Sequence, residues 1–382
     1  MQTLDILERL IAFDSVSENS NLDIIDYIDD FLGARGFSVH RVPSLDGAKA
    51  GLFAVLGPQD HAGIMLSAHT DVVPVAGQTW TTDPFRLTCK DDRAYGRGTT
   101  DMKGYVACVM ALADRASKVA LSEPLKIAFS YDEEIGCVGI QHMIGQLAKT
   151  IGLPRACIVG EPTQMKVAVG HKGKAALRAT CIGQSGHSAL APDFVNALHL
   201  AGDFLAGLRS LQDELAKTGA RDTAYAIPYS TVHVGELHGG IALNVVPNTA
   251  VLTMEYRHLA ADSADDLLTR IKLIAQTSAA PFRQQLPEAR IDIEQYNAYP
   301  GLDVSPAVEV VSLVQGFTQT DTPIKVAFGT EAGVFDQLGV PSVVCGPGSM
   351  QGQGHKPDEY VELSELRACD AMMDRVLDEL KA

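Results

Sequence analysis

The sequence lacks an apolar run long enough to cross a membrane, and it lacks any pair of cysteines at CxxC spacing. A membrane-spanning helix needs about 18 or more consecutive apolar residues, and no such stretch occurs in the 382 residues. A membrane partner is therefore not expected. The seven cysteines are scattered and odd in number, which argues against a disulfide framework and predicts a protein of the reducing cytoplasm.

Basic residues are also fewer than acidic residues. The chain has 31 Lys and Arg against 47 Asp and Glu, which gives a net charge of −16. A nucleic-acid-binding surface needs a basic stripe that contacts phosphates, so nucleic acid is not an expected partner. The acidic balance is compatible with a metal site or a cationic substrate, although an ordinary solvated surface accounts for most of it.

Four common catalytic signatures are absent from the sequence. It contains no Walker A phosphate loop, no GxSxG elbow, no GxGxxG fingerprint and no HExxH helix. A phosphate-loop enzyme, a serine hydrolase, a dinucleotide-dependent enzyme and a zincin therefore have no support from motifs.

Short apolar segments alternate with segments of helical periodicity in the first part of the chain. We predict strands at 37–42, 52–56, 64–68, 125–130 and 156–159, and helices at 4–13, 22–34 and 104–116. This alternation is typical of an α/β sheet that is covered by helices on both faces.

The pattern changes near Gly173 to a β-α-β-β-α-β order, which is typical of a small α+β domain. The α/β pattern resumes after Ile291, with further strands predicted at 324–327 and 342–345. We therefore predict that one domain is inserted into another. Residues 1–173 and 290–382 would form the first domain, and residues 174–289 the inserted one.

Five short clusters of histidine and acidic residues follow the predicted strands. They lie at residues 67–71, 100–104, 132–134, 160–162 and 354–359. Sites in open α/β sheets collect outside the carboxyl ends of strands, so we expect these clusters to meet. They contain no cysteine, which favours a metal site for hydrolytic chemistry over a closed structural zinc site.

The acidic side chains of these clusters would repel one another at one edge of a sheet: Asp101, Glu133, Glu134 and Glu161. Two divalent cations about 3.5–4 Å apart would remove that repulsion. His69 and Asp71 are two residues apart and can point to one face, so Asp71 could hold the imidazole of His69. Taken singly, Asp101 could instead cap a helix, and the glutamates could belong to a solvated surface.

In this order the clusters resemble the motifs of the M20 family of metallopeptidases and amidohydrolases, and the resemblance covers nearly the whole chain. It implies a zinc-peptidase-like catalytic domain with a mixed β-sheet flanked by helices. It also implies an inserted ferredoxin-like α+β domain for dimerisation or as a lid, and hence a homodimer. Two divalent metal ions per subunit are expected, usually Zn²⁺, with Co²⁺ as the alternative.

The resemblance also implies roles for the metal ligands. Asp101 would bridge the two ions, and the Asp101–Met102 peptide bond would be cis. His69 and Glu161 would complete one ion, while Glu134 and His355 would complete the other.

The same resemblance implies two further roles. Glu133 would be the general base, and Asp71 joins the catalytic residues through its spacing to His69. His187 would reach the site of a partner subunit, where a donor is needed for charge on the carbonyl oxygen.

Several segments, including 329–332 and 345–349, resemble the acetylornithine deacetylases of this family. This implies a small N-acyl amino acid as substrate, N2-acetyl-L-ornithine, and its hydrolysis to L-ornithine and acetate in arginine biosynthesis. Glu331 would pair with the substrate ammonium, while Asn244 and Arg257 would hold its carboxylate. The alternatives are a succinyl-diaminopimelate desuccinylase, an aminoacylase, a dipeptidase, or an inactive relative that only binds its ligand.

Overall fold

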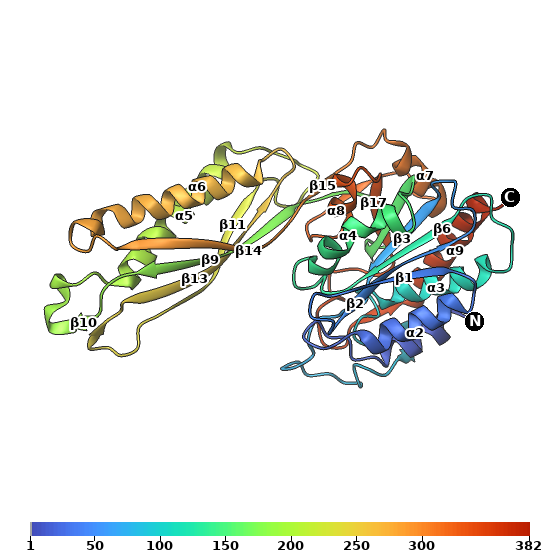
Figure 1. Cartoon of the computed structure of the whole chain (residues 1–382), viewed down its shortest axis with the longest axis horizontal. Coiled ribbons are helices and arrows are strands. Elements are labelled where there is room, and N and C mark those ends of the chain that lie inside the picture. Colours follow the sequence, from blue (N-terminus) through green and yellow to red (C-terminus); the bar gives the residue numbers. More distant parts are fainter. Residues whose placement is uncertain (1) are drawn as a thin grey trace. The chain divides into compact units, whose positions relative to one another are not determined.

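A computed structural model describes residues 2–382 and divides them into two compact units (Figure 1). The larger unit ends at His171 and resumes at Leu302, and the smaller unit is Lys172–Gly301. No helix among residues 2–382 combines the length and apolar character that crossing a bilayer requires.

The larger unit is built on a mixed nine-stranded sheet in the order β1-β2-β6-β3-β7-β17-β8-β15, with β16 beside β8. Strands β6, β3, β7 and β17 run parallel to one another and are buried along their whole lengths. Their continuous apolar sequences fit strands that are covered on both faces. The bounds are β1 (Ser38–Pro43), β2 (Ala50–Leu56), β3 (Ile64–His69), β6 (Leu125–Ser130), β7 (Ala156–Pro162), β8 (Ala168–His171), β15 (Leu302–Asp303), β16 (Ile324–Val326) and β17 (Ser342–Gly346).

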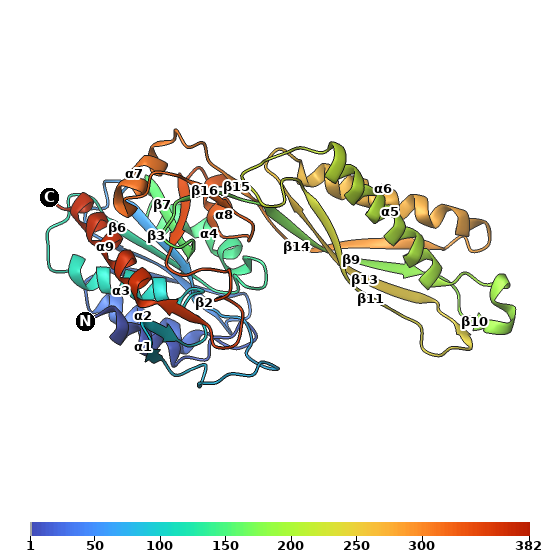
Figure 2. The same ribbon diagram turned by 180° about the vertical axis from the view of Figure 1, so that it is seen from behind.

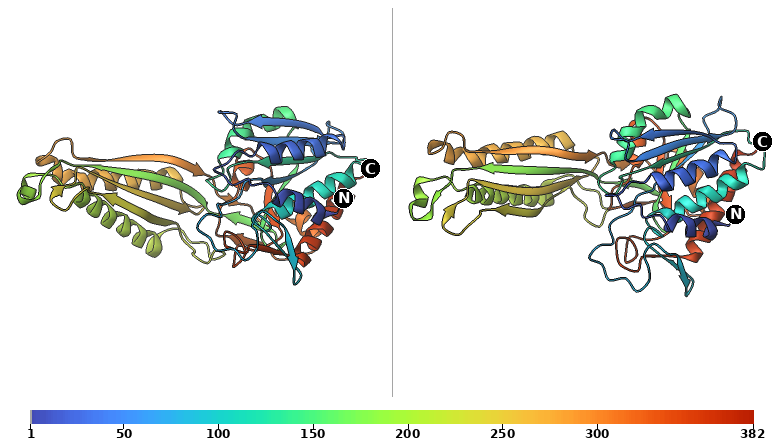
Figure 3. Two further views of the ribbon diagram at one scale, coloured as in Figure 1. Left: turned by 90° about the horizontal axis from the view of Figure 1, so that it is seen from below. Right: turned by 60° about the horizontal axis from the view of Figure 1, so that its bottom comes forward.

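Helices cover both faces of this sheet (Figure 3). On one face, α3 packs against α1, α2 and α9, and every residue of α3 except Arg115 is buried. On the other face, α4 contacts α8. The helices are α1 (Thr3–Ile11), α2 (Leu22–Gly33), α3 (Lys103–Ala116), α4 (Val138–Thr150), α7 (Glu309–Thr318), α8 (Ala332–Gln337) and α9 (Leu363–Leu380).

A second, three-stranded antiparallel sheet of the larger unit joins segments that are far apart in the chain. Its order is β18-β5-β4, with β4 at Thr88–Lys90, β5 at Arg93–Tyr95 and β18 at Tyr360–Glu362. The sheet therefore brings the segment before Asp101 next to the segment after His355.

The smaller unit has the predicted β-α-β-β-α-β order, with its antiparallel strands arranged β11-β13-β9-β14. Helices α5 and α6 lie side by side on the sheet and share its apolar core (Figure 2). The main elements are β9 (Gly173–Ile182), α5 (Ala197–Thr218), β11 (Thr231–Gly239), β13 (Thr249–His258), α6 (Ala264–Ala279) and β14 (Arg290–Tyr299). Two short strands, β10 (Gly186–His187) and β12 (Val245–Val246), pair beside them.

The boundary after the inserted domain differs from the prediction at residues 289 and 290. Strand β14 pairs with β9 from Arg290 to Tyr299, so the smaller unit continues to Gly301. The α/β pattern therefore resumes only at Leu302, and the strands predicted at 324–327 and 342–345 are β16 and β17. The apolar residues of β14 complete the inserted sheet and do not start a strand of the larger one.

Candidate metal centre

Three neighbouring parallel strands deliver candidate ligands to one edge of the large sheet. Strand β3 lies between β6 and β7 and runs parallel to both. His69 is the last residue of β3, Glu161 lies near the end of β7, and Glu133 and Glu134 follow the end of β6. The carboxyl ends of parallel strands share an edge, so these four side chains meet as predicted.

Asp101 joins them from the turn that precedes α3. Helix α3 approaches β7 closely at Gly160, where an added Cβ would lie 2.0 Å from the Tyr105 ring. Only a glycine allows this close approach, which brings the start of α3 towards Glu161. The Asp101–Met102 peptide bond is cis, as the family resemblance implies.

The carboxylate of Asp101 lies between two histidines. Its Oδ1 is 3.0 Å from Nε2 of His69, and its Oδ2 is 3.1 Å from Nε2 of His355. His69 Nε2 also lies 3.7 Å from Oε1 of Glu161, and His355 Nε2 lies 2.9 Å from Oε2 of Glu134. A carboxylate with one oxygen towards each of two ligand groups is the arrangement expected of a residue that bridges two ions.

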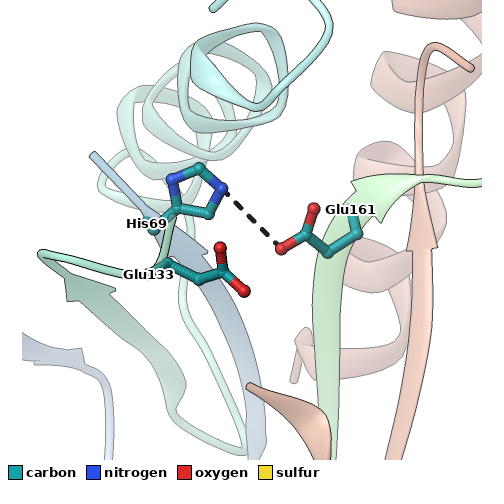
Figure 4. Close-up of side chains that lie close together, drawn as sticks. All are labelled: His69, Glu133 and Glu161. Carbon is teal, nitrogen blue, oxygen red and sulfur yellow. Dashed lines mark ion pairs between the residues drawn. The ribbon is translucent and has the colours of Figure 1, made fainter. Parts of the chain in front are cut away.

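Potential ligand atoms also gather in two groups that share His69, with the atoms of each group within 4.8 Å of one another. One group is His69, Glu133 and Glu161, and the other is His69, Asp101 and Glu134. In Figure 4 the His69 ring and the Glu161 carboxylate face each other, with Glu133 beside them. Proximity alone therefore does not separate Glu133 from the predicted ligands.

The electrostatics of this edge favour bound cations. Burial raises the pKa of Glu134 to about 7 and also raises the pKa values of Glu133 and Glu161, and neighbouring carboxylates add to the effect. Oε1 of Glu134 and Oε1 of Glu161 are buried without a hydrogen-bond partner. Burial opposes ionisation of Asp101 too, but hydrogen bonds with His355 and His69 outweigh it and lower its pKa. Buried carboxylates that each have one unpartnered oxygen and lie beside imidazoles suit divalent metal ions.

Asp71 supports the site in two ways. The nearest partner of His69 Nδ1 is the backbone carbonyl of Asp71 at 2.9 Å, whereas the Asp71 carboxylate is 3.5 Å away. The carboxylate instead accepts the main-chain N–H groups of Glu133 and Glu134, at 3.1 and 3.3 Å, and the hydroxyl of Ser17 at 2.6 Å. The predicted contact with His69 is therefore made mainly by the backbone of Asp71.

Glu331 is a buried acid of the larger unit outside these ligand groups. It immediately precedes α8, it is 1% exposed, and neither of its carboxylate oxygens has a hydrogen-bond partner. Burial raises its pKa to about 7, and the nearby Ser130 hydroxyl acts in the opposite direction. A carboxylate in this position is costly unless a cation or a proton compensates it.

The remaining predicted residues, His187, Asn244 and Arg257, belong to the smaller unit. Nδ1 of His187 accepts the N–H of Ala189 at 3.0 Å, and the carbonyl of Asn244 accepts the N–H of Ser188 at 3.1 Å. Arg257 lies near the far end of β13 and pairs with Glu255 at 2.9 Å.

Asn244 and Arg257 lie far apart within the smaller unit. Asn244 precedes β12, and the distance from the start of β13 to Arg257 is roughly 26 Å at about 3.3 Å per residue. Within one copy of the chain, these two side chains cannot hold the same substrate carboxylate.

Residues 65–379 match the family described as peptidase family M20/M25/M40. The chain belongs to this family. The match includes every candidate ligand and the whole smaller unit. As an M20 hydrolase, the chain is a metal-dependent enzyme of the amidohydrolase and peptidase type.

The similarity of this M20 chain to other family members extends along its whole length. It is 32% identical to the acetylornithine deacetylase of Salmonella heidelberg (strain SL476), over 98% of this chain and 96% of that protein. Its fold matches the M20 family metallo-carboxypeptidase Sso-CP2 from Sulfolobus solfataricus with a TM-score of 0.79 and 18% identity, over 99% and 98% of the two chains.

A further structural match is the YXEP protein of Bacillus subtilis, described as a dinuclear metal binding peptidase from the M20 family. Its TM-score is 0.67 at 14% identity, over 99% of this chain and 97% of that one. These likenesses confirm the predicted fold class, a mixed sheet flanked by helices with an inserted α+β domain.

Proposed function

We propose that this M20 hydrolase cleaves the amide bond of N2-acetyl-L-ornithine and releases L-ornithine and acetate, a step of arginine biosynthesis in the cytoplasm. The observation that carries the proposal is Glu331, a buried carboxylate without a hydrogen-bond partner. The ammonium group of the ornithine side chain would supply its counter-charge. The full-length similarity to an acetylornithine deacetylase supports the same substrate.

The donor set fits two divalent ions, with Zn²⁺ as the first choice and Co²⁺ as the alternative. We assign His69 and Glu161 to one ion, Glu134 and His355 to the other, and Asp101 to both. The unpartnered oxygens of Glu134 and Glu161 support this assignment. When bound, the ions would acidify a water molecule and polarise the amide carbonyl.

We assign to Glu133 the two proton transfers of the hydrolysis, from the attacking water and to the leaving nitrogen. Its carboxylate takes a proton from the attacking water as the new C–O bond forms at the amide carbon. It then delivers that proton to the leaving nitrogen as the C–N bond breaks. Burial raises the pKa of Glu133, which suits a carboxyl group that must hold a proton between the two steps. Asp71 fixes the main chain of Glu133 during both transfers.

A homodimer would allow Asn244 of one chain and Arg257 of another to meet at one substrate. One substrate carboxylate can contact Asn244 and Arg257 only if they come from two copies of the chain. We propose that the end of the smaller unit with His187 and Asn244 serves the site of the partner. There the His187 imidazole would donate to the carbonyl oxygen as negative charge develops.

The deciding experiment is a turnover panel with the protein loaded with Zn²⁺ or Co²⁺. The panel compares N2-acetyl-L-ornithine, N-succinyl-diaminopimelate, N-acetylmethionine and a dipeptide. We expect the highest kcat/KM for acetylornithine. A higher value for succinyl-diaminopimelate, N-acetylmethionine or the dipeptide would replace the deacetylase with a desuccinylase, an aminoacylase or a dipeptidase, respectively. No turnover of any of them would contradict all four activities.

A further inference from the structure

A buried ion pair, Arg97 with Glu359, contacts the main chain of Asp101. Arg97 and Glu359 are 2.6 Å apart, from the guanidinium NH1 to Oε2, and each side chain is 1% exposed. A buried pair of this kind must recover the cost of desolvation through further hydrogen bonds. The further hydrogen bonds of Arg97 and Glu359 therefore show which segments of the chain this ion pair connects.

The Glu359 carboxylate holds the segment of the bridging ligand. Its Oε1 accepts the main-chain N–H of Thr100 at 2.9 Å and that of Asp101 at 3.1 Å. Asp101 lies in a turn, so the strand ladder does not fix its position. The contact with Glu359 fixes the main chain from which the Asp101 carboxylate reaches both histidines.

The second amino group of the Arg97 guanidinium is connected to His355 through Gln78. Its NH2 donates to Oε1 of Gln78 at 2.6 Å, and Nε2 of Gln78 donates to the main-chain carbonyl of His355 at 3.3 Å. His355 has a φ of 61°, unusual for a residue other than glycine, and lies in a turn with its side chain 44% exposed. The contact with Gln78 therefore holds the main chain from which the imidazole reaches Asp101 and Glu134.

We propose that Arg97 and Glu359 are positioning residues for one of the two metal ions, the ion assigned to Asp101, Glu134 and His355. The forked guanidinium ties the Asp101 segment to the His355 segment through Glu359 on one side and Gln78 on the other. The other ion depends less on this pair, because strands β3 and β7 hold His69 and Glu161. The inference rests on the metal centre proposed above, and it does not depend on the identity of the substrate.

The test is a titration of metal-free protein with Co²⁺, without substrate, followed by calorimetry and visible absorption. The wild-type protein should bind two ions. Arg97→Met should bind the ion of Glu134 and His355 about 10- to 100-fold more weakly, with an altered Co²⁺ spectrum and a smaller loss at the other ion, which shares Asp101. The matched control is Arg93→Met, which removes the partly exposed ion pair of Arg93 with Glu362 on the adjacent strand. The control should bind both ions as the wild type does.

Two further variants separate positioning from folding and from charge. Arg97→Met leaves Glu359 buried without its partner, so the double variant Arg97→Met/Glu359→Gln removes both charges and should be folded by circular dichroism. It should still bind the ion of Glu134 and His355 more weakly than the other ion. Arg97→Lys keeps the positive charge but has one ammonium in place of the fork, so it should not restore the affinity.

The outcomes are distinct. If folded Arg97→Met or the folded double variant binds two Co²⁺ ions with wild-type affinity, the inference is wrong. Full restoration by Arg97→Lys would overturn the role of the fork. Wild-type protein that binds fewer than two ions would instead contradict the metal centre itself.

Discussion

The main-chain N–H of Glu133 donates to Oδ1 of Asp71 at 3.1 Å. The same carboxylate accepts the N–H of Glu134, so one buried acid fixes the main chain of both the proposed base and a proposed ligand. Asp71 reaches them from the end of β3, across the boundary between two parallel strands. Its carboxylate accepts the main-chain N–H groups of two residues that follow β6, while its main-chain carbonyl contacts Nδ1 of His69.

Replacement of Asp71 by asparagine should therefore impair catalysis more than substrate binding. An amide has only one acceptor oxygen, so it cannot accept both main-chain N–H groups and the Ser17 hydroxyl in the same way. We expect kcat to fall about 10- to 100-fold with KM nearly unchanged. Steady-state kinetics check this, with Asp46→Asn as the control, because Asp46 accepts a main-chain N–H in an exposed turn. An equal loss in the control would contradict the assignment.

Replacement of Glu133 by glutamine should separate metal binding from turnover. The amide keeps the size of the side chain but cannot accept the proton, so kcat should fall about 10²- to 10⁴-fold. The variant should still bind two metal ions in a calorimetric titration. Loss of one ion would show that Glu133 is a ligand, as its proximity to His69 and Glu161 permits.

Replacement of Glu331 by glutamine should discriminate between substrates. The variant loses the charge that pairs with the substrate ammonium, and a charge-assisted hydrogen bond contributes about 1.5–3 kcal/mol. KM for N2-acetyl-L-ornithine should thus rise by roughly 10- to 100-fold, whereas KM for N-acetylmethionine should change little. Equal effects on both substrates would rule out the proposed pairing.

Hybrid dimers should reveal whether His187 acts on the partner's site. A His187→Ala chain and a Glu133→Gln chain, each expected to be inactive as a homodimer, are co-expressed with different tags and purified together. One of the two sites in the hybrid then combines an intact Glu133 with an intact His187 from the other chain. The hybrid should have about half the wild-type activity. Activity at the level of the parent variants would place both residues in the same chain's site.

The parts of the fold that were predictable are those with local causes. Strands β3, β6 and β7 are buried over their whole lengths, so their sequences are continuous apolar runs that can be recognised one segment at a time. Strand β14 has no such run, and it belongs to the smaller unit because it pairs with β9, more than a hundred residues earlier in the chain. That pairing has no local signal.

The same distinction applies to the metal centre. His69 and Glu161 could be predicted because they end continuous apolar strands, and Asp101 because its cluster directly precedes a predicted helix. Arg97 is buried against Glu359, which is 262 residues away, and no pattern near Arg97 in the sequence predicts this partner. The contact of Asp71 with the main chain of Glu133 also cannot be predicted from the sequence, because every residue type has the same main-chain groups.

The inserted unit has a consequence for the newly made protein. When the ribosome has completed His171, strand β7 and five of the acids and histidines of the metal centre are present, but His355 and the β17 partner of β7 are not. At about 5–20 residues per second, synthesis of the rest takes roughly 10–40 seconds. During that time the nascent chain has an unpaired strand edge and an incomplete metal centre, so residues 2–171 and 302–382 must come together before the enzyme can work.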